Sequence, residues 1–547
     1  MRIIYTLLFL LLTHFSYSQM QFSWAKSFNG NGTQLLPKKI VTDNAGNSYV
    51  AGCFSGTQTF DTVSIVAKGT TDAYLAKFNA TGNCLWARTY GFSISQTYGT
   101  CVAIDAAGNV ILGGNFTNYF NIDTSYTISL GQTDMFMIKH DTQGNLIKFN
   151  TAGGTSTDNL NTITTDMQGR YYIGGSFGFK CFFGNDSIQT PNLSPLSDIF
   201  LAAYDVNMQP VWAKRAGGAS DNDVAKSIQF RNNSIYLAGI IIGNNCTFGT
   251  NSVNSYGQSD AVVAKYALDG TNQWVKRAGG TANDYCNALS TDSFGNVYIT
   301  GAFILNATFG AAPSSFNLTA GNAEDMFIAK YDSLGVCKFA KKAGSAAPGS
   351  DAGNGISTDS YGYSVVAGSF MGTANFVSTT LTSSGVGDGF VAKYDPTGTC
   401  QYALKIGGSG DDLGMNVCWS PANNYFYAVG GYQGTATLTG NITLTASNTF
   451  SGFIAGVPGF YASINEVNQI NNLVYPNPAN NVLSFNTSYL NQAHQVEVYD
   501  VVGNMVYVSN DITDNLTINT TAWANGFYTV KLLSAENVSM MKVLIAH

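Results

Sequence analysis

The stretch "SDAVVAKYALDGTNQWVKRAGG" (residues 259–280) recurs along the chain and decides the fold. An aspartate precedes an apolar run, a lysine follows it, and a turn leads to a second strand that ends in glycine. Close copies are "TDAYLAKFNATGNCLWARTYG" (71–91), "EDMFIAKYDSLGVCKFAKKAGS" (324–345) and "GDGFVAKYDPTGTCQYALKIGG" (387–408). A fixed period of this kind is typical of repeat architectures. The aspartate recurs every 62 to 65 residues, at Asp72, Asp134, Asp198, Asp260, Asp325 and Asp388.

A second half-unit alternates with the first. Its clearest copies are "AIDAAGNVILGGNF" (103–116), "STDSFGNVYITGAF" (290–303) and "STDSYGYSVVAGSF" (357–370). The Asp-x-x-Gly core predicts a tight hairpin turn between two strands, so each full unit holds four strands. A longer segment between the second and third strands carries a recurring apolar residue, at Phe60, Ile122, Phe183, Phe248, Phe309, Phe376 and Leu438.

Four antiparallel strands per repeat, arranged about an axis, are typical of a β-propeller. Seven copies of the second half-unit predict an all-β fold with a seven-bladed β-propeller over residues 19–460. A solenoid is the alternative architecture. It would need capping repeats at both ends, and the sequence does not show them.

The fragment "QFSWAKSFNG" (21–30) precedes the first full unit and matches only a fourth strand. The last unit (430–457) has a third strand but no fourth. Trp24 aligns with residues such as Trp86 and Trp212, which we expect to pack between blades. We therefore expect the N-terminal fragment to supply the missing outer strand and to close the ring, which leaves no open edge.

The signatures "GNVYITG" (295–301) and "DMFIAKYDSLG" (325–335) resemble the SBBP-type seven-bladed β-propeller repeat of secreted bacterial proteins. The resemblance covers residues 21 to about 460. Two units depart from the pattern. Ala203 stands where other units carry lysine, and "RNN" (231–233) replaces the Asp-x-x-Gly turn. These departures weaken individual copies and leave the predicted blade number unchanged.

The period stops after residue 460, and residues 461–470 are a predicted linker. Residues 471–547 contain alternating runs such as "LVYPNPANNVLSFN" (473–486), which predict a small Ig-like β-sandwich. Together these motifs resemble the C-terminal sorting domain of the type IX secretion system of Bacteroidetes. The resemblance implies that the secretion machinery carries the protein through the outer membrane. The resemblance also implies that the tail is then removed, with release or surface anchoring of the protein. The matching address and fold residues are Tyr475, Pro476, Asn477, Pro478, Gly503, Gly526, Tyr528 and Lys542.

Composition bounds the class of protein. Residues 1–18 have a basic start, a short apolar core and small residues before Gln19, which predicts a secretory signal peptide. No later run is long and apolar enough for a membrane helix. The net charge of −7 argues against nucleic acid as a partner. The nine cysteines include no C-x-x-C pair, and their odd number leaves at least one unpaired within the chain.

The sequence shows no convincing catalytic motif. "GGSFG" (174–178) matches the G-x-S-x-G nucleophile elbow, but it ends a repeat strand and no helix follows, so we interpret it as structural. His140 replaces the tyrosine or phenylalanine of other units, and no paired-histidine motif exists. We therefore predict no catalytic residue, no metal ligand and no cofactor. A structural cation has no support in the sequence.

The starts of the first and third strands should lie on one face of the ring, which also carries the longer loops. That face could bind a cation or a polar glycan through its carboxylates. In the alternative interpretation each aspartate bonds loop amides or a lysine and stabilises its own blade, which suits a residue present in nearly every repeat. The candidate binding residues are Asp72, Asp134, Asp158, Asp198, Asp260, Asp284, Asp325, Asp388 and Asp412.

These observations suggest a monomeric binding or adhesion module, secreted or held on the outer-membrane surface after passage through the periplasm. Binding would use the longer-loop face and the central channel, on an unidentified ligand such as a glycan or a surface protein. One alternative is an extracellular propeller enzyme that cleaves polysaccharides with two or three face carboxylates. The other is a structural surface protein without a small ligand.

Overall fold

The computed structural model contains only β-strands as extended regular elements in the residues it describes, which confirms the all-β prediction. The chain divides into two compact units, Met1–Gly459 and Phe460–His547. The predicted signal peptide (1–18) and linker (461–470) lie outside the described residues. Those residues are 20–122, 125–191, 194–218, 222–345, 349–447, 449–459, 474–485, 493–500, 505–510, 516–534 and 538–547.

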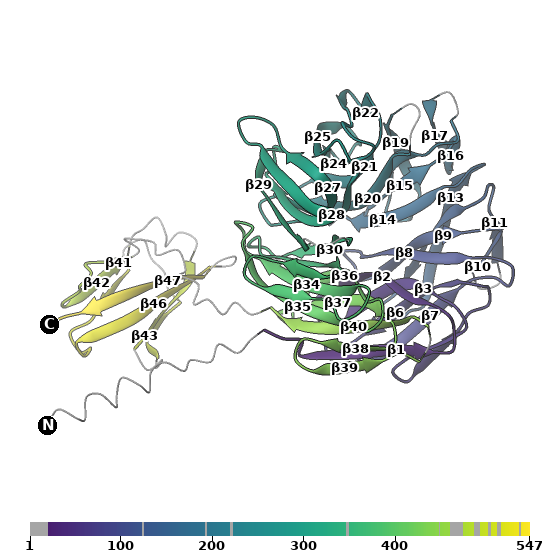
Figure 1. Ribbon diagram of the computed structural model, residues 1–547. Helices are drawn as coiled ribbons and strands as arrows, with labels where there is room; N and C mark the ends of the chain where they lie inside the picture. The colour runs from purple at the N-terminus through teal and green to yellow at the C-terminus, as the bar shows by residue number, and fades with distance from the viewer. Residues whose placement is uncertain are drawn as a thin grey trace. The chain divides into compact units, whose positions relative to one another are not determined.

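The larger unit consists of four-stranded antiparallel sheets, which we call blades, set around a common axis (Figure 1). The first strand of each blade lines the central channel. These inner strands are β2 (Leu35–Thr42), β8 (Thr97–Ile104), β14 (Asn159–Thr165), β20 (Val224–Arg231), β26 (Asp284–Thr291), β30 (Ala352–Thr358) and β36 (Leu413–Ser420).

The remaining strands follow outward in each blade. The second strands are β3 (Ser48–Phe54), β9 (Val110–Phe116), β15 (Tyr171–Phe177), β21 (Ser234–Ile241), the start of β27 (Val297–Phe309), β31 (Ser364–Phe370) and β37 (Tyr425–Tyr432). The third strands are β6 (Asp72–Phe78), β12 (Asp134–His140), β18 (Asp198–Tyr204), β24 (Asp260–Tyr266), the end of β28 (Phe316–Tyr331), β34 (Asp388–Tyr394) and β40 (Ser451–Pro458). The fourth strands are β7 (Cys84–Tyr90), β13 (Leu146–Gly154), β19 (Pro210–Gly217), β25 (Asn272–Gly280), β29 (Cys337–Ser345), β35 (Cys400–Gly408) and β1 (Trp24–Gly30).

The Asp-x-x-Gly turns are closed by their own aspartate. In the turn between β2 and β3, Asp43 Oδ1 accepts hydrogen bonds from the N–H groups of Ala45 (3.0 Å) and Asn47 (2.8 Å). Gly46 has a φ of +80°, a left-handed conformation that glycine adopts without steric cost. The motif therefore encodes the turn through one side-chain acceptor and one permissive residue.

Strand β1 closes the ring, as the sequence predicts. It pairs antiparallel with β40, with Trp24 opposite Gly456 and Phe28 opposite Gly452. On its other side β1 pairs with β4 (Thr57–Phe60), where Phe28 stands opposite Phe60. The first and last described segments of this unit thus share one sheet, and β1 has a hydrogen-bonded neighbour on both sides.

The longer segments form small hairpins that cross from one blade to the next. In most blades the first strand of the hairpin pairs with the fourth strand of the preceding blade, as β16 does with β13 and β38 with β35. The β10–β11 hairpin is the exception in the described structure, where it forms a separate two-stranded sheet. The sequence predicted the extra length but not this pairing. The hairpins are β4 and β5 (Val63–Val66), β10 (Tyr119–Ile122) and β11 (Ser125–Ile128), β16 (Lys180–Phe183) and β17 (Asp186–Gln189), β22 (Cys246–Phe248) and β23 (Asn251–Val253), the joined ends of β27 and β28, β32 (Thr373–Asn375) and β33 (Thr380–Thr382), and β38 (Thr435–Leu438) and β39 (Ile442–Thr445). The recurring apolar residues they carry, from Phe60 to Leu438, are all buried.

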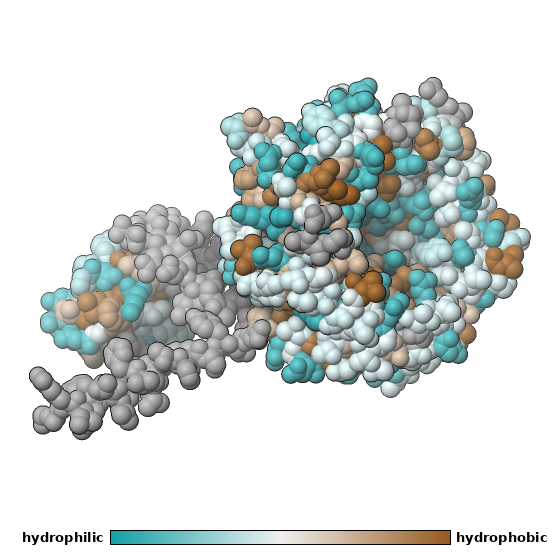
Figure 2. Space-filling model, viewed as in Figure 1, coloured by the Kyte–Doolittle hydropathy of each residue, from teal (hydrophilic) through white to brown (hydrophobic). Residues whose placement is uncertain are grey.

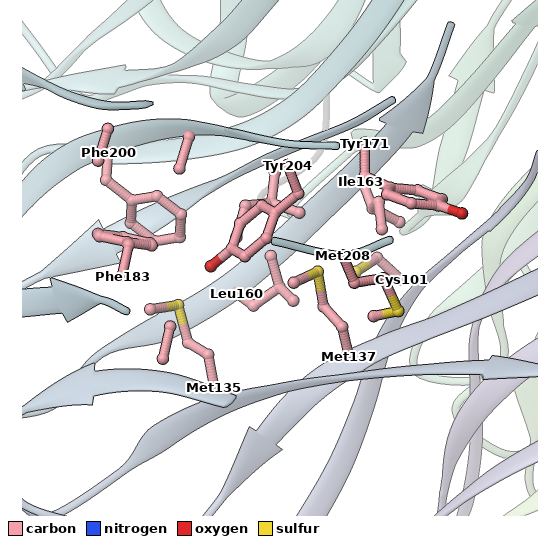
Figure 3. Packing of buried hydrophobic residues seen from close by; sticks show 14 of the residues in the cluster. Cys101, Met135, Met137, Leu160, Ile163, Tyr171, Phe183, Phe200, Tyr204 and Met208 are labelled. Atoms are coloured by element: carbon pink, nitrogen blue, oxygen red, sulfur yellow. The ribbon is translucent and has the colours of Figure 1, made fainter. Parts of the chain in front are cut away.

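Apolar side chains fill the space between neighbouring blades. Figure 3 shows Met135 and Met137 of β12 beside Leu160 of β14 and Tyr204 of β18, all buried in one cluster. Each blade therefore completes its core with side chains of the next. By contrast, exposed apolar residues are scattered over the face shown in Figure 2.

Fourth-strand aromatic residues also join the blades, as expected from the repeat. Trp86 donates a hydrogen bond from Nε1 to the carbonyl of Thr142 in the next blade (3.1 Å). Its ring covers Gly144, where an added Cβ would lie 2.9 Å from a ring atom. Trp24 covers Gly82 in the same manner, so β1 makes the contact of an ordinary fourth strand.

The C-terminal unit has two antiparallel sheets with one apolar core that includes Val474, Leu483, Val498 and Ile545. One sheet has the order β41 (Val474–Tyr475), β42 (Val482–Phe485) and β45 (Thr517–Asn519). The other has the order β44 (Met505–Ser509), β43 (Ala493–Tyr499), β46 (Gly526–Ser534) and β47 (Val538–Ile545).

Phe28→Ala tests the closure of the ring. The Phe28 side chain is 1% exposed and lies 4.9 Å from the Phe60 ring and 5.3 Å from the Phe78 ring, measured between centroids. Loss of a buried phenylalanine costs about 3–5 kcal/mol, so we expect a clear fall in the thermal unfolding temperature of the propeller. Tyr126→Ala is the control, because Tyr126 is 67% exposed. An unchanged unfolding temperature for Phe28→Ala would contradict closure by β1.

Candidate functional site

The predicted face aspartates are buried at the starts of the first and third strands. At most 4% of the surface of any one of them is exposed in the described structure. Asp72 accepts hydrogen bonds from the N–H groups of Lys68 (2.8 Å) and Gly69 (3.0 Å), and Asp134 accepts one from Leu130 (2.7 Å). The third-strand carboxylate therefore holds the loop that leads into its own strand.

The first-strand aspartates bind loop amides in a similar way. Asp412 accepts hydrogen bonds from the N–H groups of Gly408 (2.7 Å) and Gln433 (3.1 Å). Asp158 and Asp284 occupy the same position in their blades and also bond loop amides. These contacts match the architectural interpretation of the aspartates. Ligand binding by them stays a prediction.

Most third-strand aspartates also pair with a basic residue of the fourth strand. The ion pairs are Arg215–Asp198, Arg277–Asp260 (3.4 Å), Lys342–Asp325 (2.6 Å) and Lys405–Asp388 (3.3 Å). Thr151 occupies the corresponding place beside Asp134, since it stands opposite Phe136 as Arg215 stands opposite Phe200. Among the described residues, no basic side chain forms an ion pair with Asp134 or Asp158.

Burial makes the Asp134–Asp158 pair favour protonation. Burial raises the pKa of Asp134 to about 6. Burial, helped by the charge of Asp134, raises the pKa of Asp158 to about 7. Asp134 Oδ1 and Asp158 Oδ2 have no hydrogen-bond partner in the described structure.

The inner strands enclose a central channel with a cavity of about 250 Å³. The lining contains one lysine and no carboxylate. The sequence predicts binding at this channel but does not identify its residues, because no motif marks them. Its hydrogen-bonding side chains include Lys39, Thr162, Ser227, Ser290, Ser357 and Asn416.

Side chains typical of catalysis are buried within the blades. Ser176 of the "GGSFG" stretch is 4% exposed in the middle of a sheet, and no helix follows it. His140 is fully buried, its Nε2 bonds the Tyr90 hydroxyl, and burial lowers its pKa to about 4. The nine cysteines form no disulfide with one another. The described residues hold no group of three or more histidine, cysteine, aspartate or glutamate side chains placed to bind a metal ion.

Several predicted sorting residues hold the C-terminal unit together. Asn477 donates a hydrogen bond from Nδ2 to the Lys542 carbonyl (3.1 Å) and accepts one from the N–H of Leu544 (2.9 Å). The segment therefore lies against β47. Pro476 and Pro478 follow cis peptide bonds, and Tyr475 is 54% exposed.

The remaining sorting residues lie on β46 and β47. Gly526 begins β46, the Tyr528 hydroxyl bonds the Ala524 carbonyl (3.0 Å), and Lys542 Nζ lies 3.9 Å from the centre of the Phe527 ring. Gly503 lies outside the described residues.

The fold and these contacts define a β-propeller and a small second β unit. Residues 473–546 match the family model of the secretion system C-terminal sorting domain, and residues 273–302 match that of the SBBP β-propeller repeat. Both resemblances are thus confirmed. The sorting domain indicates export by type IX secretion, to the medium or the cell surface. None of the described residues forms a helix that could span a membrane.

Whole-chain comparisons find only distant similarity. The chain is 23% identical over 492 residues to a WD repeat-containing protein, L264, of Acanthamoeba polyphaga mimivirus, covering 72% of this chain and 35% of that relative's length. The periplasmic gluconolactonase of Pseudomonas aeruginosa aligns with a TM-score of 0.40 at 9% identity, covering 75% of this chain and 99% of that one. The extracellular domain of the one component system BT4673 of B. thetaiotaomicron aligns with a TM-score of 0.23 at 12% identity, covering 93% and 80%.

Thr151→Arg tests the buried carboxyl pair. A raised carboxyl pKa means that the folded state holds its protons more tightly than the unfolded chain, so stability falls as the pH rises through about 6 to 7. An arginine at position 151 should reach Asp134 as Arg215 reaches Asp198. We expect it to raise the unfolding free energy by on the order of 1 kcal/mol at pH 8, and by less at pH 5.

Thermal and urea unfolding at the two pH values measure this difference. Thr151→Gln is the matched control, because glutamine extends the side chain without adding charge. Equal pH dependence of the two variants would show that Asp134 and Asp158 do not titrate in this range.

Proposed function

We propose that this protein is a secreted or cell-surface binding or adhesion module whose site is the central channel. The observation that supports this proposal is the difference between two sets of polar groups. The face aspartates are bound to amides and basic residues of the blades, whereas the channel presents polar side chains around a cavity of about 250 Å³. A mouth or cavity enclosed by strands is a common place for a ligand in closed β architectures.

The proposal includes a particular organisation of the chain. Residues 1–18 would be a signal peptide, 19–460 a seven-bladed propeller, 461–470 a linker and 471–547 an Ig-like sorting domain. The repeat count and the strand order of the sheets support the blade number. The two packed sheets of the C-terminal unit support the sandwich.

The alternative of a polysaccharide-cleaving enzyme has less support. Such an enzyme needs two carboxyl groups that reach the substrate, about 5–10 Å apart. The candidate carboxylates are no more than 4% exposed, and most are engaged with loop amides. A purely structural surface protein would not need a polar channel.

A glycan array and a polysaccharide degradation screen on the mature protein separate these functions. We expect retention of at least one glycan or surface protein without release of reducing sugar. Turnover of any polysaccharide would favour the enzyme. If the protein neither binds nor degrades any of the compounds tested, a structural surface protein is favoured.

Removal of residues 471–547 tests the sorting assignment. Because the tail carries the type IX address, we expect the truncated protein to accumulate in the periplasm of its host. Immunoblots of cell fractions measure the distribution, and a periplasmic marker protein controls for lysis. Normal export of the truncated chain would refute the assignment.

A further inference from the structure

At one level of the central channel, each inner strand carries a different residue. Each inner strand carries a β-bulge, and the next residue resumes the pairing register at the same place in every blade. Most of these residues line the cavity. They are Lys39, Cys101, Thr162, Ser227, Ala288, Gly355 and Asn416.

Several lining oxygens accept hydrogen bonds from the neighbouring blade. Thr162 Oγ1 accepts one from the N–H of Ile228 (2.9 Å), and Asn416 Oδ1 accepts one from the N–H of Ile40 (3.3 Å). Within the described part of the chain, the Thr162 hydroxyl proton and the Asn416 Nδ2 group have no recorded acceptor. These side chains therefore offer donors to the channel.

The next level of the channel repeats this arrangement. Ser290 Oγ and Ser357 Oγ each accept a hydrogen bond of 2.9 Å from an N–H of the adjacent blade, those of Thr358 and Trp419. Their hydroxyl protons are likewise available to donate hydrogen bonds into the cavity. Two levels of the wall thus present hydrogen-bond donors to the cavity.

Lys39 is the one basic side chain among the residues that line the cavity. Its Nζ forms no hydrogen bond or ion pair with the described residues, and the lining contains no carboxylate. Burial lowers the pKa of Lys39, and the thiols of Cys101 and Cys418 oppose that shift. A partly buried ammonium without a counter-ion is costly, and a bound anion would relieve that cost.

We propose that the central channel binds a small oxyanion, the carboxylate of a sugar acid or a phosphate, with Lys39 as the charged contact. Thr162, Ser290, Ser357 and Asn416 donate hydrogen bonds to the ligand's oxygens. The cavity has the volume of roughly eight water molecules, which suits one sugar ring or one phosphate with its water. This inference rests on the proposed binding function and names the ligand class of the same site.

Isothermal titration calorimetry on the mature protein tests the inference. The probes are glucuronate, inorganic phosphate and, as the neutral comparison, glucose. We expect the protein to bind glucuronate or phosphate and to ignore glucose, and the preferred anion identifies the ligand's source. Lys39→Met should weaken binding at least tenfold, and Lys39→Arg should restore most of it.

Lys38→Met is the matched control. Lys38 is the bulge residue next to Lys39 and does not line the cavity, so its loss should change the affinity by less than twofold. If Lys39→Met does not fold, Lys39→Gln replaces it, with the unfolding temperature as the check. Wild-type affinity in the Lys39 variant would overturn the inference.

The glycan array distinguishes failure of this inference from failure of the proposed function. Retention of a neutral glycan by both the wild type and Lys39→Met would overturn the anion site and leave the binding module intact. If the wild type binds no probe in either assay, both proposals fall.

Discussion

The pairing of β1 with β40 is the constraint on which the propeller depends. It joins residues such as Trp24 and Gly456, which are more than 400 residues apart in the chain. Closure entropy grows only with the logarithm of loop length, so this separation costs roughly 2 kcal/mol more than closing one 60-residue repeat. Burial of Phe28 alone contributes about 3–5 kcal/mol, which outweighs that difference. Without β1, both β40 and β4 would present unpaired strand edges.

The hairpins extend this pairing to most of the other blade boundaries, although β10 and β11 form a separate sheet. Because β16 pairs with β13 and β38 with β35, backbone hydrogen bonds as well as side chains cross from blade to blade. Open repeat arrays gain stability unit by unit, from each repeat and its nearest neighbour. A ring with β1 paired on both sides has no terminal repeat at which unfolding could start. We therefore expect the ring to unfold cooperatively, as a single domain would.

The features that recur in every unit could be predicted from the sequence, because each recurs for a local physical reason. Asp43 and Gly46 define a turn by themselves, and Trp24 matched Trp86 because both cover a turn glycine of the next blade. The pairing of the hairpins with the preceding blade could not be predicted. An apolar residue such as Phe60 or Phe183 indicates that the segment is buried, but not which strand it pairs with. The sequence also left open whether Asp134 and the equivalent aspartates are buried, because a carboxylate that recurs in nearly every repeat can face solvent or bond a loop. The channel residues carried no motif at all.

The channel shows where function and architecture separate in a repeat protein. A residue needed to build a blade must be present in most blades, as is the aspartate that begins β6, β12 and β18. A ligand in the centre of the ring meets all the blades at once, so its contacts need not repeat. The position after the bulge is threonine or serine in two blades, and lysine, cysteine, alanine, glycine or asparagine in one blade each. This variation has little effect on the stability of the fold, because the backbone bulge and not the side chain sets the pairing register of the strand. Selection for a ligand is free to act there, and the lone Lys39 is the residue that an architectural requirement does not explain.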